Sequence, residues 1–298
     1  MSKPLVTIIT ITRNRGALIH RAIESILNQT YGNFEYIIVD GASNDNTKAV
    51  VQGYRDNRIK FIELLENYPI PKTINIGFEN SNGDYITFLD DDDEYCPTKI
   101  EKQLDLILTL PEKYGFVYCW MDYFDDFSNK FLYTHKSELR GYVATEIVER
   151  PLLSGTPSYF FRRIVFEQLG GWKDDIGIIS DWELAARACQ KYYVDYVPES
   201  LIKVFINHGK NRMSDLTFYS DILKRKVKFH KYFLTEFKSI FDKYPNKSVW
   251  NLFEISRSYF MLGEWKNGWR YYKELLKYNL TIKVLLLPPY CMIKRRRR

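Results

Sequence analysis

The sequence predicts an α/β protein with a mostly parallel, Rossmann-like sheet and a helical C-terminal appendage. Apolar, β-branched segments alternate with amphipathic segments from residue 5 to residue 110, which is typical of strands joined by crossover helices. The first strand-like segment is apolar without polar alternation, as expected of a strand buried on both faces. Beyond residue 215 the pattern is helical and basic. A chain of 298 residues, 45% of them hydrophobic, is long enough for one large domain with such an appendage.

The first elements follow one another as strand and helix. In residues 17–29, Leu18, Ala22 and Ile26 recur near helical spacing and form one apolar face. Asp45 or Asn46 is a candidate N-cap for a short second helix. We therefore expect strands at residues 5–12, 34–39, 59–64 and 85–89, and helices at residues 17–29, 47–54, 70–80 and 97–110.

The second half of the chain has a mixed pattern. We expect strands at residues 116–120, 158–161 and 193–197, a helix at residues 181–191, and a pair of helices within residues 248–277. The predicted organisation is one large α/β domain at residues 1–210, a helical region at 211–280 and an apolar and basic tail at 281–298.

The net charge of +6 conceals an uneven distribution along the chain. Residues 1–209 hold 22 Lys and Arg against 30 Asp and Glu, whereas residues 210–298 hold 21 against 7. The chain ends in Lys294 and four arginines, directly after the apolar stretch 284–293. An apolar segment followed by cations favours attachment to an anionic membrane surface. A nucleic-acid arm and a flexible solubilising end are the alternatives; we expect no nucleic-acid partner.

The cysteines and the apolar runs bear on where the protein resides. Four scattered cysteines without a C-x-x-C pair predict reduced thiols and not a disulfide framework. No secretory signal is visible, and no apolar run approaches the roughly 20 residues that span a bilayer. We expect a cytoplasmic protein that lies peripherally on the inner face of the cell membrane. The oligomeric state does not follow from the sequence.

The acidic run Asp90, Asp91, Asp92 and Asp93 directly follows the apolar segment 85–89. Adjacent carboxylates repel one another, and a strand that delivers them to its C-terminal end builds a site for a hard divalent cation. A solvated acidic turn is the alternative. Open α/β sheets bind ligands at the carboxyl ends of their strands, which favours a metal site.

Polar residues also follow the first two predicted strands. Thr12, Asn14 and Arg15 lie at a strand-to-helix junction, where N–H groups and side-chain donors can meet a nucleotide. Asp40 ends the second strand and is followed by small residues that allow close approach of a ligand. The three clusters are expected at the same edge of one sheet.

Three segments resemble the nucleotide-sugar half of the inverting family 2 glycosyltransferases of bacterial type. They are residues 5–15 (LVTIITITRNR), 37–45 (IIVDGASND) and 83–93 (GDYITFLDDDD), and the resemblance covers roughly residues 4–210. It implies a GT-A fold in which residues 1–210 are the nucleotide-sugar-binding and catalytic domain. It also implies transfer of a sugar from a nucleotide diphosphate donor to an acceptor hydroxyl, usually with Mn²⁺ or Mg²⁺. A UDP-sugar is the favoured donor, and the acceptor is a glycan or a lipid-linked molecule in bacterial surface polysaccharide or glycan assembly.

The resemblance assigns the nucleotide-binding residues. Thr12, Asn14 and Arg15 are expected around the base, and Asp40 is expected to contact it, although Gly41 replaces a second aspartate common in the family. Lys72 stands where an arginine is frequent near the base and diphosphate, and lysine lacks the bidentate fork of arginine.

The same resemblance assigns the metal-binding and catalytic residues. Asp90 and Asp92 match the two aspartates of the D-x-D motif, so Asp92 is the expected metal ligand and Asp90 a ribose or metal contact. Asp91 is placed with the nucleotide-binding residues, with a structural role as the alternative. His208 matches a position where some members hold a histidine near the diphosphate or metal. Asp181, at the start of a predicted helix, matches the catalytic base; a plain N-cap is the alternative.

Two other functions remain open from the residues alone. A nucleotidyltransferase also uses a Rossmann-like sheet with metal-binding aspartates, but the Gly-rich phosphate loop expected of it is absent after Thr12. A non-catalytic sugar-nucleotide-binding protein is the second alternative, because Asp181 is the only candidate base.

Overall fold

The computed structural model describes residues 3–174, 176, 180–207, 219–278, 280–288 and 291. The chain divides into two compact units. Unit 1 consists of Met1–Val143, Leu152–Asp174 and Arg187–Lys210, and unit 2 consists of Ala144–Pro151, Asp175–Ala186 and Asn211–Arg298.

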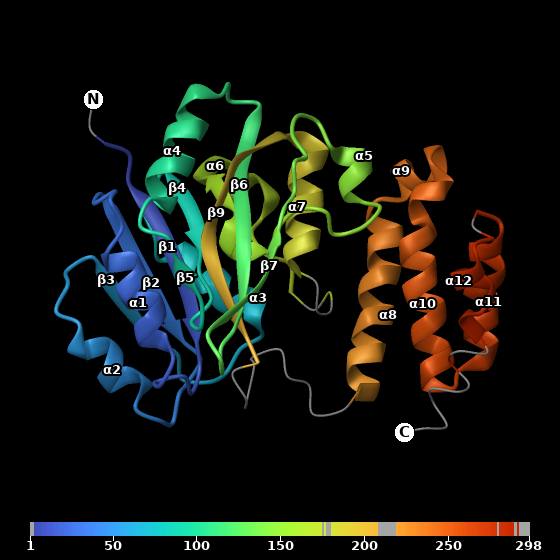
Figure 1. The fold of residues 1–298 in the computed structure, drawn as a ribbon, viewed down its shortest axis with the longest axis horizontal. Helices are drawn as coiled ribbons and strands as arrows, with labels where there is room; N and C mark the ends of the chain where they lie inside the picture. Colours follow the sequence, from blue (N-terminus) through green and yellow to red (C-terminus); the bar gives the residue numbers. More distant parts are fainter. Residues whose placement is uncertain are drawn as a thin grey trace. The chain divides into compact units, whose positions relative to one another are not determined.

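Unit 1 is built on a nine-stranded sheet with the order β3-β2-β1-β4-β8-β6-β9-β5, and β7 pairs with β6 (Figure 1). The pairs β1–β2, β1–β4, β2–β3 and β6–β9 are parallel, which confirms the predicted α/β class with a mostly parallel sheet. The strands are β1 (Val6–Thr12), β2 (Phe34–Asp40), β3 (Ile59–Glu63), β4 (Tyr85–Phe88), β5 (Glu94–Tyr95), β6 (Tyr114–Asp125), β7 (Lys130–His135), β8 (Phe160–Arg162) and β9 (Tyr193–Ile206).

Helices cover both faces of this sheet. One face packs against α1 (Ile19–Leu27), α2 (Thr47–Gly53) and α4 (Lys99–Thr109), whose apolar residues share one core with alternate residues of the strands. The other face packs against α3 (Ile70–Glu79) and α6 (Arg163–Leu169). On that face a Cβ at Gly77 would lie 2.8 Å from Ile9 Cγ2, so glycine allows α3 to approach β1 closely.

The elements expected between residues 5 and 110 are all present, with ends shifted by one or two residues. Later elements differ more from expectation. β6 and β9 continue well beyond the predicted strands, because the polar Asp122 in β6 is satisfied within the sheet by Thr134 Oγ1 and Ser200 Oγ (both 2.7 Å). Strand β7 and helix α6 lie where the sequence predicts no element.

Unit 2 contains the C-terminal helices. They are α8 (Tyr219–Glu236), α9 (Lys238–Lys243), α10 (Val249–Leu262), α11 (Trp265–Leu276) and α12 (Ile282–Leu285), and the unit also contains α5 (Ala144–Ile147) and most of α7 (Ser180–Lys191). Gly263 joins α10 to α11 with a φ of 82°, a conformation that favours glycine. At Gly268 a Cβ would lie 2.5 Å from the ring of Phe260. The predicted helix pair at 248–277 is therefore confirmed, and glycine permits its close packing.

The four cysteines are free thiols, as the sequence predicts. Cys119, Cys189 and Cys291 are buried, and Cys96 is partly buried. Burial raises the pKa of the Cys119 thiol to about 12, so this thiol is an unreactive part of the core.

Lys99 is a fully buried cation beneath the sheet and provides a test of the fold. Its Nζ donates to Thr87 Oγ1 (2.5 Å) and lies 3.9 Å from the centre of the Tyr95 ring. Burial lowers the pKa of Lys99 from 10.5 to about 7. Because the folded pKa is below the unfolded one, the unfolded chain binds more protons between these values, and stability should rise as pH rises from about 7.

We expect Lys99→Met to raise the free energy of unfolding at pH 7 by on the order of 1 kcal/mol. Thr87 Oγ1 would keep its bonds to the Tyr159 carbonyl and the Tyr95 hydroxyl, so no buried polar atom loses its last partner. Urea unfolding at pH 6.5, 7.5 and 8.5 measures the effect. The difference in the free energy of unfolding between the variant and the parent should become smaller as pH rises. A difference that grows with pH would contradict this account of Lys99.

Candidate active site

Thr12 and Asp40 lie side by side at the carboxyl edge of the parallel strands. Each is the last residue of its strand, and the register of β1 and β2 pairs them directly. Both side chains are buried. Thr12 Oγ1 donates to Asp91 Oδ2 (2.7 Å) from the loop after β4. The structure therefore brings the three predicted polar clusters to one edge of the sheet.

Hydrogen bonds join the loops that follow β1 and β2. The Asn14 N–H donates to Ser43 Oγ (2.8 Å), and the Asn44 N–H donates to Asn14 Oδ1 (2.7 Å). Asn14 and Ala42 have φ values of 53° and 60°, a region that asparagine tolerates and alanine rarely adopts. Burial raises the pKa of Asp40, and hydrogen bonds from the Ser43 hydroxyl and N–H oppose this shift. These bonds hold both loops in a conformation that the backbone alone does not favour.

The acidic run forms a loop immediately after β4, in which Asp90, Asp92 and Asp93 gather. One carboxylate oxygen from each lies within 4.8 Å of the others. The loop is fixed at its start because the Leu89 N–H donates to the Ile9 carbonyl (3.1 Å). Asp90 is exposed, Asp92 is partly exposed and Asp93 is buried, so the cluster reaches from the surface into the protein.

Asp91 and Asp93 point to partners inside the fold. Asp91 accepts the hydrogen bond from Thr12, and Asp93 Oδ1 accepts one from the Phe205 N–H (2.9 Å) of β9. Burial and the neighbouring Asp92 charge raise the pKa of Asp91 to about 7. Burial, followed by the charges of Asp90 and Asp92, raises the pKa of Asp93 well above its usual range. The crowded carboxylates thus disfavour their own ionisation.

A hard divalent cation suits the chemistry of this cluster. Carboxylate oxygens are the ligands that Mg²⁺ and Mn²⁺ prefer. A cation among them would offset the mutual repulsion that, together with the larger effect of burial, raises the pKa of Asp93. Asp90, Asp92 and Asp93 are the residues that could hold it.

Arg15 contacts the acidic loop directly. Its Nη1 lies 3.3 Å from Asp92 Oδ2, and its side chain is 5% exposed. The Arg15 N–H donates to Thr47 Oγ1 (3.1 Å) at the start of α2. A residue expected at the nucleotide therefore lies against a residue expected at the metal, and both belong to the same edge of unit 1.

Lys72 lies in the first turn of α3 and is exposed. Its Nζ lies 3.5 Å from the centre of the Tyr68 ring, in the loop between β3 and α3. A cation over an aromatic face is stabilised there. A contact between Lys72 and a nucleotide-sugar donor stays a prediction.

Asp181 belongs to unit 2 and lies in the first turn of α7. The next residue anchors this end of the helix, since Trp182 Nε1 donates to the Ile147 carbonyl (2.5 Å) and the Trp182 ring lies 4.2 Å from the Phe233 ring. Asp181 Oδ1 accepts the Trp182 N–H (2.8 Å). Burial raises the pKa of Asp181, against the opposing effect of this bond. A carboxylate with a raised pKa is a better proton acceptor.

Two predictions concern residues outside the described part of the chain. The first is the predicted metal contact of His208, and the second is the predicted membrane attachment by the cations at 294–298. Among the described residues, no helix combines the length and apolar character needed to cross a bilayer.

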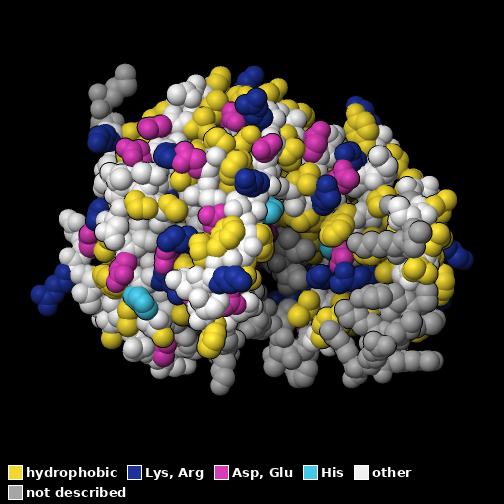
Figure 2. Space-filling model, in the orientation of Figure 1, with side chains coloured by type: hydrophobic (Ala, Val, Ile, Leu, Met, Phe, Trp, Pro, Cys, Tyr) yellow, Lys and Arg dark blue, Asp and Glu magenta, His cyan; other side chains and the backbone are white. Residues whose placement is uncertain are grey.

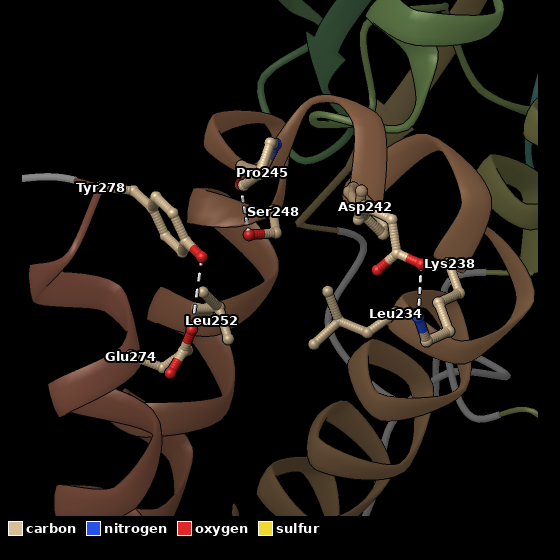
Figure 3. A pocket seen from close by; sticks show the side chains of 9 residues that line it. Leu234, Lys238, Asp242, Pro245, Ser248, Leu252, Glu274 and Tyr278 are labelled. Atoms are coloured by element: carbon tan, nitrogen blue, oxygen red, sulfur yellow. Dashed lines mark hydrogen bonds and ion pairs between the residues drawn. The ribbon is translucent and has the colours of Figure 1, made fainter.

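Unit 2 has a surface hollow of about 310 Å³ between its helices (Figure 3). Charged and polar groups that line it are paired with each other, Lys238 with Asp242 and the Tyr278 hydroxyl with Glu274 (3.4 Å). The acidic loop, in contrast, brings together like charges. The acidic loop is therefore the stronger candidate for ligand chemistry.

The chain matches the protein-family model described as glycosyl transferase family 2 over residues 7–170. These residues include all but the first residue of β1, together with β2, the acidic loop and β8, and they make up more than half of the chain. The chain belongs to glycosyl transferase family 2. It is a glycosyltransferase, and this membership decides against the nucleotidyltransferase and non-catalytic alternatives.

Curated bacterial relatives agree with this family. An uncharacterized glycosyltransferase of Rickettsia typhi is 30% identical over 235 residues, which cover 76% of this chain and 73% of the relative. WcaA of Escherichia coli, named for colanic acid biosynthesis, is 26% identical, and the alignment covers 85% of this chain and 89% of WcaA. TuaG of Bacillus subtilis, named for teichuronic acid biosynthesis, is 38% identical over an alignment that covers 36% of this chain and 43% of TuaG.

Solved glycosyltransferases share the fold. TarS of S. aureus, in complex with UDP-GlcNAc, aligns with a TM-score of 0.64 at 14% identity, over 97% of this chain and 88% of the TarS chain. The mannosyltransferase PcManGT of Pyrobaculum calidifontis, in complex with GDP-Man and Mn²⁺, aligns with a TM-score of 0.64 at 16% identity. The alignment covers 99% of this chain and 83% of the PcManGT chain. The predicted GT-A fold is confirmed.

Proposed function

We propose that this glycosyltransferase moves a sugar from a nucleotide diphosphate donor to an acceptor hydroxyl in a metal-dependent reaction that inverts the anomeric carbon. The observation that carries the proposal is the gathering of the Asp90, Asp92 and Asp93 carboxylates within 4.8 Å, in a loop that Thr12 ties to the end of β1. Carboxyl ends of parallel strands are where such folds bind nucleotides.

The nucleotide is proposed to lie against the loops after β1 and β2. Thr12, Asn14, Arg15 and Asp40 are the residues that would surround the base and ribose, and the buried Asp40 can accept a hydrogen bond from a base N–H. The structural neighbours hold UDP-GlcNAc in one case and GDP-Man in another. UDP is the favoured nucleotide for this chain because UDP-sugars are common donors in the family that it resembles.

Asp90 and Asp92 are proposed to hold Mn²⁺ or Mg²⁺, and the buried Asp93 lies beside them. Asp91 is proposed to support the nucleotide-binding residues through its hydrogen bond with Thr12. When bound, the cation would neutralise negative charge that develops on the departing diphosphate. Lys72, which the resemblance places near the base and the diphosphate, would supply further positive charge for the same phosphates. His208 is a further candidate ligand.

Asp181 is proposed as the catalytic base. It would take the proton of the acceptor hydroxyl while the hydroxyl oxygen bonds to the anomeric carbon and the bond to the diphosphate oxygen breaks. Attack opposite the leaving group gives inversion in one displacement, so no nucleophilic residue of the enzyme is required. The raised pKa of Asp181 suits a base that must accept a proton at neutral pH.

The acceptor is proposed to be a glycan or a lipid-linked molecule in the assembly of a bacterial surface polysaccharide. TuaG and WcaA, whose names refer to teichuronic and colanic acid, support this class of product. The proposed location is the cytoplasmic side of the membrane, where nucleotide sugars are made.

A panel of nucleotide sugars tests the function. The full-length enzyme is incubated with each UDP-, GDP- and dTDP-sugar, with and without Mn²⁺, and released nucleotide diphosphate is measured. We expect slow, Mn²⁺-dependent release from one donor class, UDP-sugars in the first place. Equal release with and without Mn²⁺ in EDTA-treated samples would contradict the metal-dependent mechanism.

Association with an anionic membrane surface is proposed for the C-terminal part of unit 2. Leu285, the last residue of α12, and Leu286 after it are 49% and 56% exposed. Lys273 on α11 and Lys277 directly after it are also exposed. Figure 2 shows hydrophobic side chains together with Lys and Arg over these helices. Apolar residues in the interface and cations near anionic headgroups, worth about 1 kcal/mol each, would give reversible attachment.

We expect the parent to sediment with phosphatidylserine vesicles and not with phosphatidylcholine vesicles. Replacing Leu285 and Leu286 by serine should reduce sedimentation several-fold, while Leu108→Ser, which changes a leucine 52% exposed in unit 1, should not. Substitution is preferable to truncation because Val284 and Leu287 are buried in the core of unit 2. Sedimentation of the double variant at the parental level would contradict the membrane proposal.

A further inference from the structure

Helix α1 and the turn after it present a polar stripe to the chain segment that follows the acidic run. Ser25 Oγ accepts the Tyr95 N–H (3.1 Å). The Gln29 amide donates to the Cys96 carbonyl (2.9 Å) and accepts from the Ile100 N–H (3.1 Å). Arg21, four residues before Ser25, completes the stripe, since positions spaced by four lie on one helix face. The three bonds of Ser25 and Gln29 all go to backbone groups of residues 95–100.

Arg21 is the member of the stripe that reaches the acidic loop. Its Nη1 donates to the Asp92 carbonyl (3.0 Å) and its Nη2 to Asp126 Oδ1 (2.7 Å), just after β6. The guanidinium carbon lies 3.9 Å from the centre of the Phe205 ring. Arg21 Nε is also 3.7 Å from Glu94 Oε1.

These contacts enclose the acidic loop from several sides. Phe205, whose ring lies under Arg21, is the residue whose N–H holds Asp93 Oδ1 (2.9 Å). Asp126 is itself fixed to β9, because its N–H donates to the Ile206 carbonyl (2.8 Å). Arg21 thus ties the backbone of Asp92 to the ends of two other strands.

We propose that Arg21 is a positioning residue that sets the geometry of the metal-binding loop through the Asp92 carbonyl. A planar guanidinium can donate to a carbonyl and a carboxylate in different directions and still stack on an aromatic ring, whereas an ammonium cannot. Fixing the carbonyl of Asp92 fixes the direction in which its carboxylate leaves the backbone. The inference rests on the proposed metal centre. It adds a residue that supports a metal ligand and is not itself proposed to contact the nucleotide sugar.

A purely structural role for Arg21 is the alternative, and Arg58 provides a matched control. Arg58 Nη2 donates to Asp56 Oδ2 (2.7 Å), and its guanidinium lies 4.2 Å from the centre of the Phe34 ring. Arg58 therefore has the same pairing with a carboxylate and a ring as Arg21, but lies by the turn before β3. Arg21→Met and Arg58→Met should lower stability by similar amounts.

Two measurements on the full-length chain separate positioning from stability. Hydrogen exchange follows the amides of residues 89–95, and electron paramagnetic resonance of free Mn²⁺ gives the affinity for the metal alone. Arg21→Met should speed exchange in this segment and weaken Mn²⁺ binding by about 10–100-fold, the usual effect of losing a residue behind a metal ligand. Arg21→Lys should recover part of the affinity, and Arg58→Met should leave both readouts at the parental level.

The outcomes distinguish this inference from the proposed function. Parental exchange and parental Mn²⁺ affinity in Arg21→Met would overturn the inference while leaving the metal centre standing. Faster exchange in Arg21→Met, with no Mn²⁺ bound by the parent, would support positioning of the loop and contradict the metal centre.

Discussion

Asp181→Asn is expected to reduce kcat for sugar transfer by about 10²–10⁴-fold, the usual contribution of a positioned general base. The amide has nearly the shape of the carboxyl group and can still accept the Trp182 N–H through its oxygen, so the start of α7 should keep its structure. Donor affinity should remain within about twofold, because the proposed base acts on the acceptor and not on the nucleotide. Steady-state transfer and calorimetric titration with UDP measure the two quantities.

The control for this variant is Asp195→Asn. Asp195 Oδ1 accepts the N–H of the next residue, Tyr196 (2.9 Å), as Asp181 accepts that of Trp182, but Asp195 lies within β9 and has no proposed role in the reaction. It should keep parental kcat. Parental turnover in Asp181→Asn would show that another group takes the proton. The parental kcat should also fall as pH falls through the raised pKa of Asp181, because protonation removes the base.

Asp92→Ala should abolish transfer, with a loss on the order of 10³-fold or more, because it removes a proposed metal ligand and with it the charge that offsets the departing diphosphate. Excess EDTA should inactivate the parent to the same extent, and added Mn²⁺ should restore the parent but not the variant. The variant should also release Arg15 from its ion pair, so nucleotide affinity without metal should not fall.

Asp84→Asn is the control for Asp92→Ala. Asp84 lies just before β4, where Oδ2 accepts the Leu5 N–H (2.9 Å), whereas Asp92 lies beyond the other end of the same strand. The control should lower stability slightly and leave Mn²⁺-dependent activity intact. Full activity of Asp92→Ala, or of the parent in EDTA, would contradict a role for the metal.

The parts of the fold that depend on local pattern could be predicted from the sequence. β1 is β-branched throughout and buried throughout, and the acidic run follows β4 as its position after an apolar segment predicts. The convergence of Thr12, Asp40 and Asp91 also follows, because parallel strands bring their carboxyl ends to one edge.

Other parts depend on contacts that leave no trace in residue pattern. Asp93 is held by a backbone N–H 112 residues away, and any residue type at Phe205 supplies that donor. Arg21 acts on the Asp92 carbonyl, which every residue possesses, so the polar stripe of α1 resembles an ordinary solvated helix face. The length of β6 was not predictable because Asp122 is satisfied by Thr134 and Ser200 from two neighbouring strands.

The most direct test of the proposed site is a crystal structure of the full-length chain grown with Mn²⁺ and UDP, with anomalous diffraction used to locate manganese. The proposed site predicts one strong peak in coordination contact with the carboxylate of Asp92, with the base of UDP beside Asp40. A UDP molecule bound at this edge without manganese at the acidic loop, or manganese bound elsewhere in the protein, would contradict it.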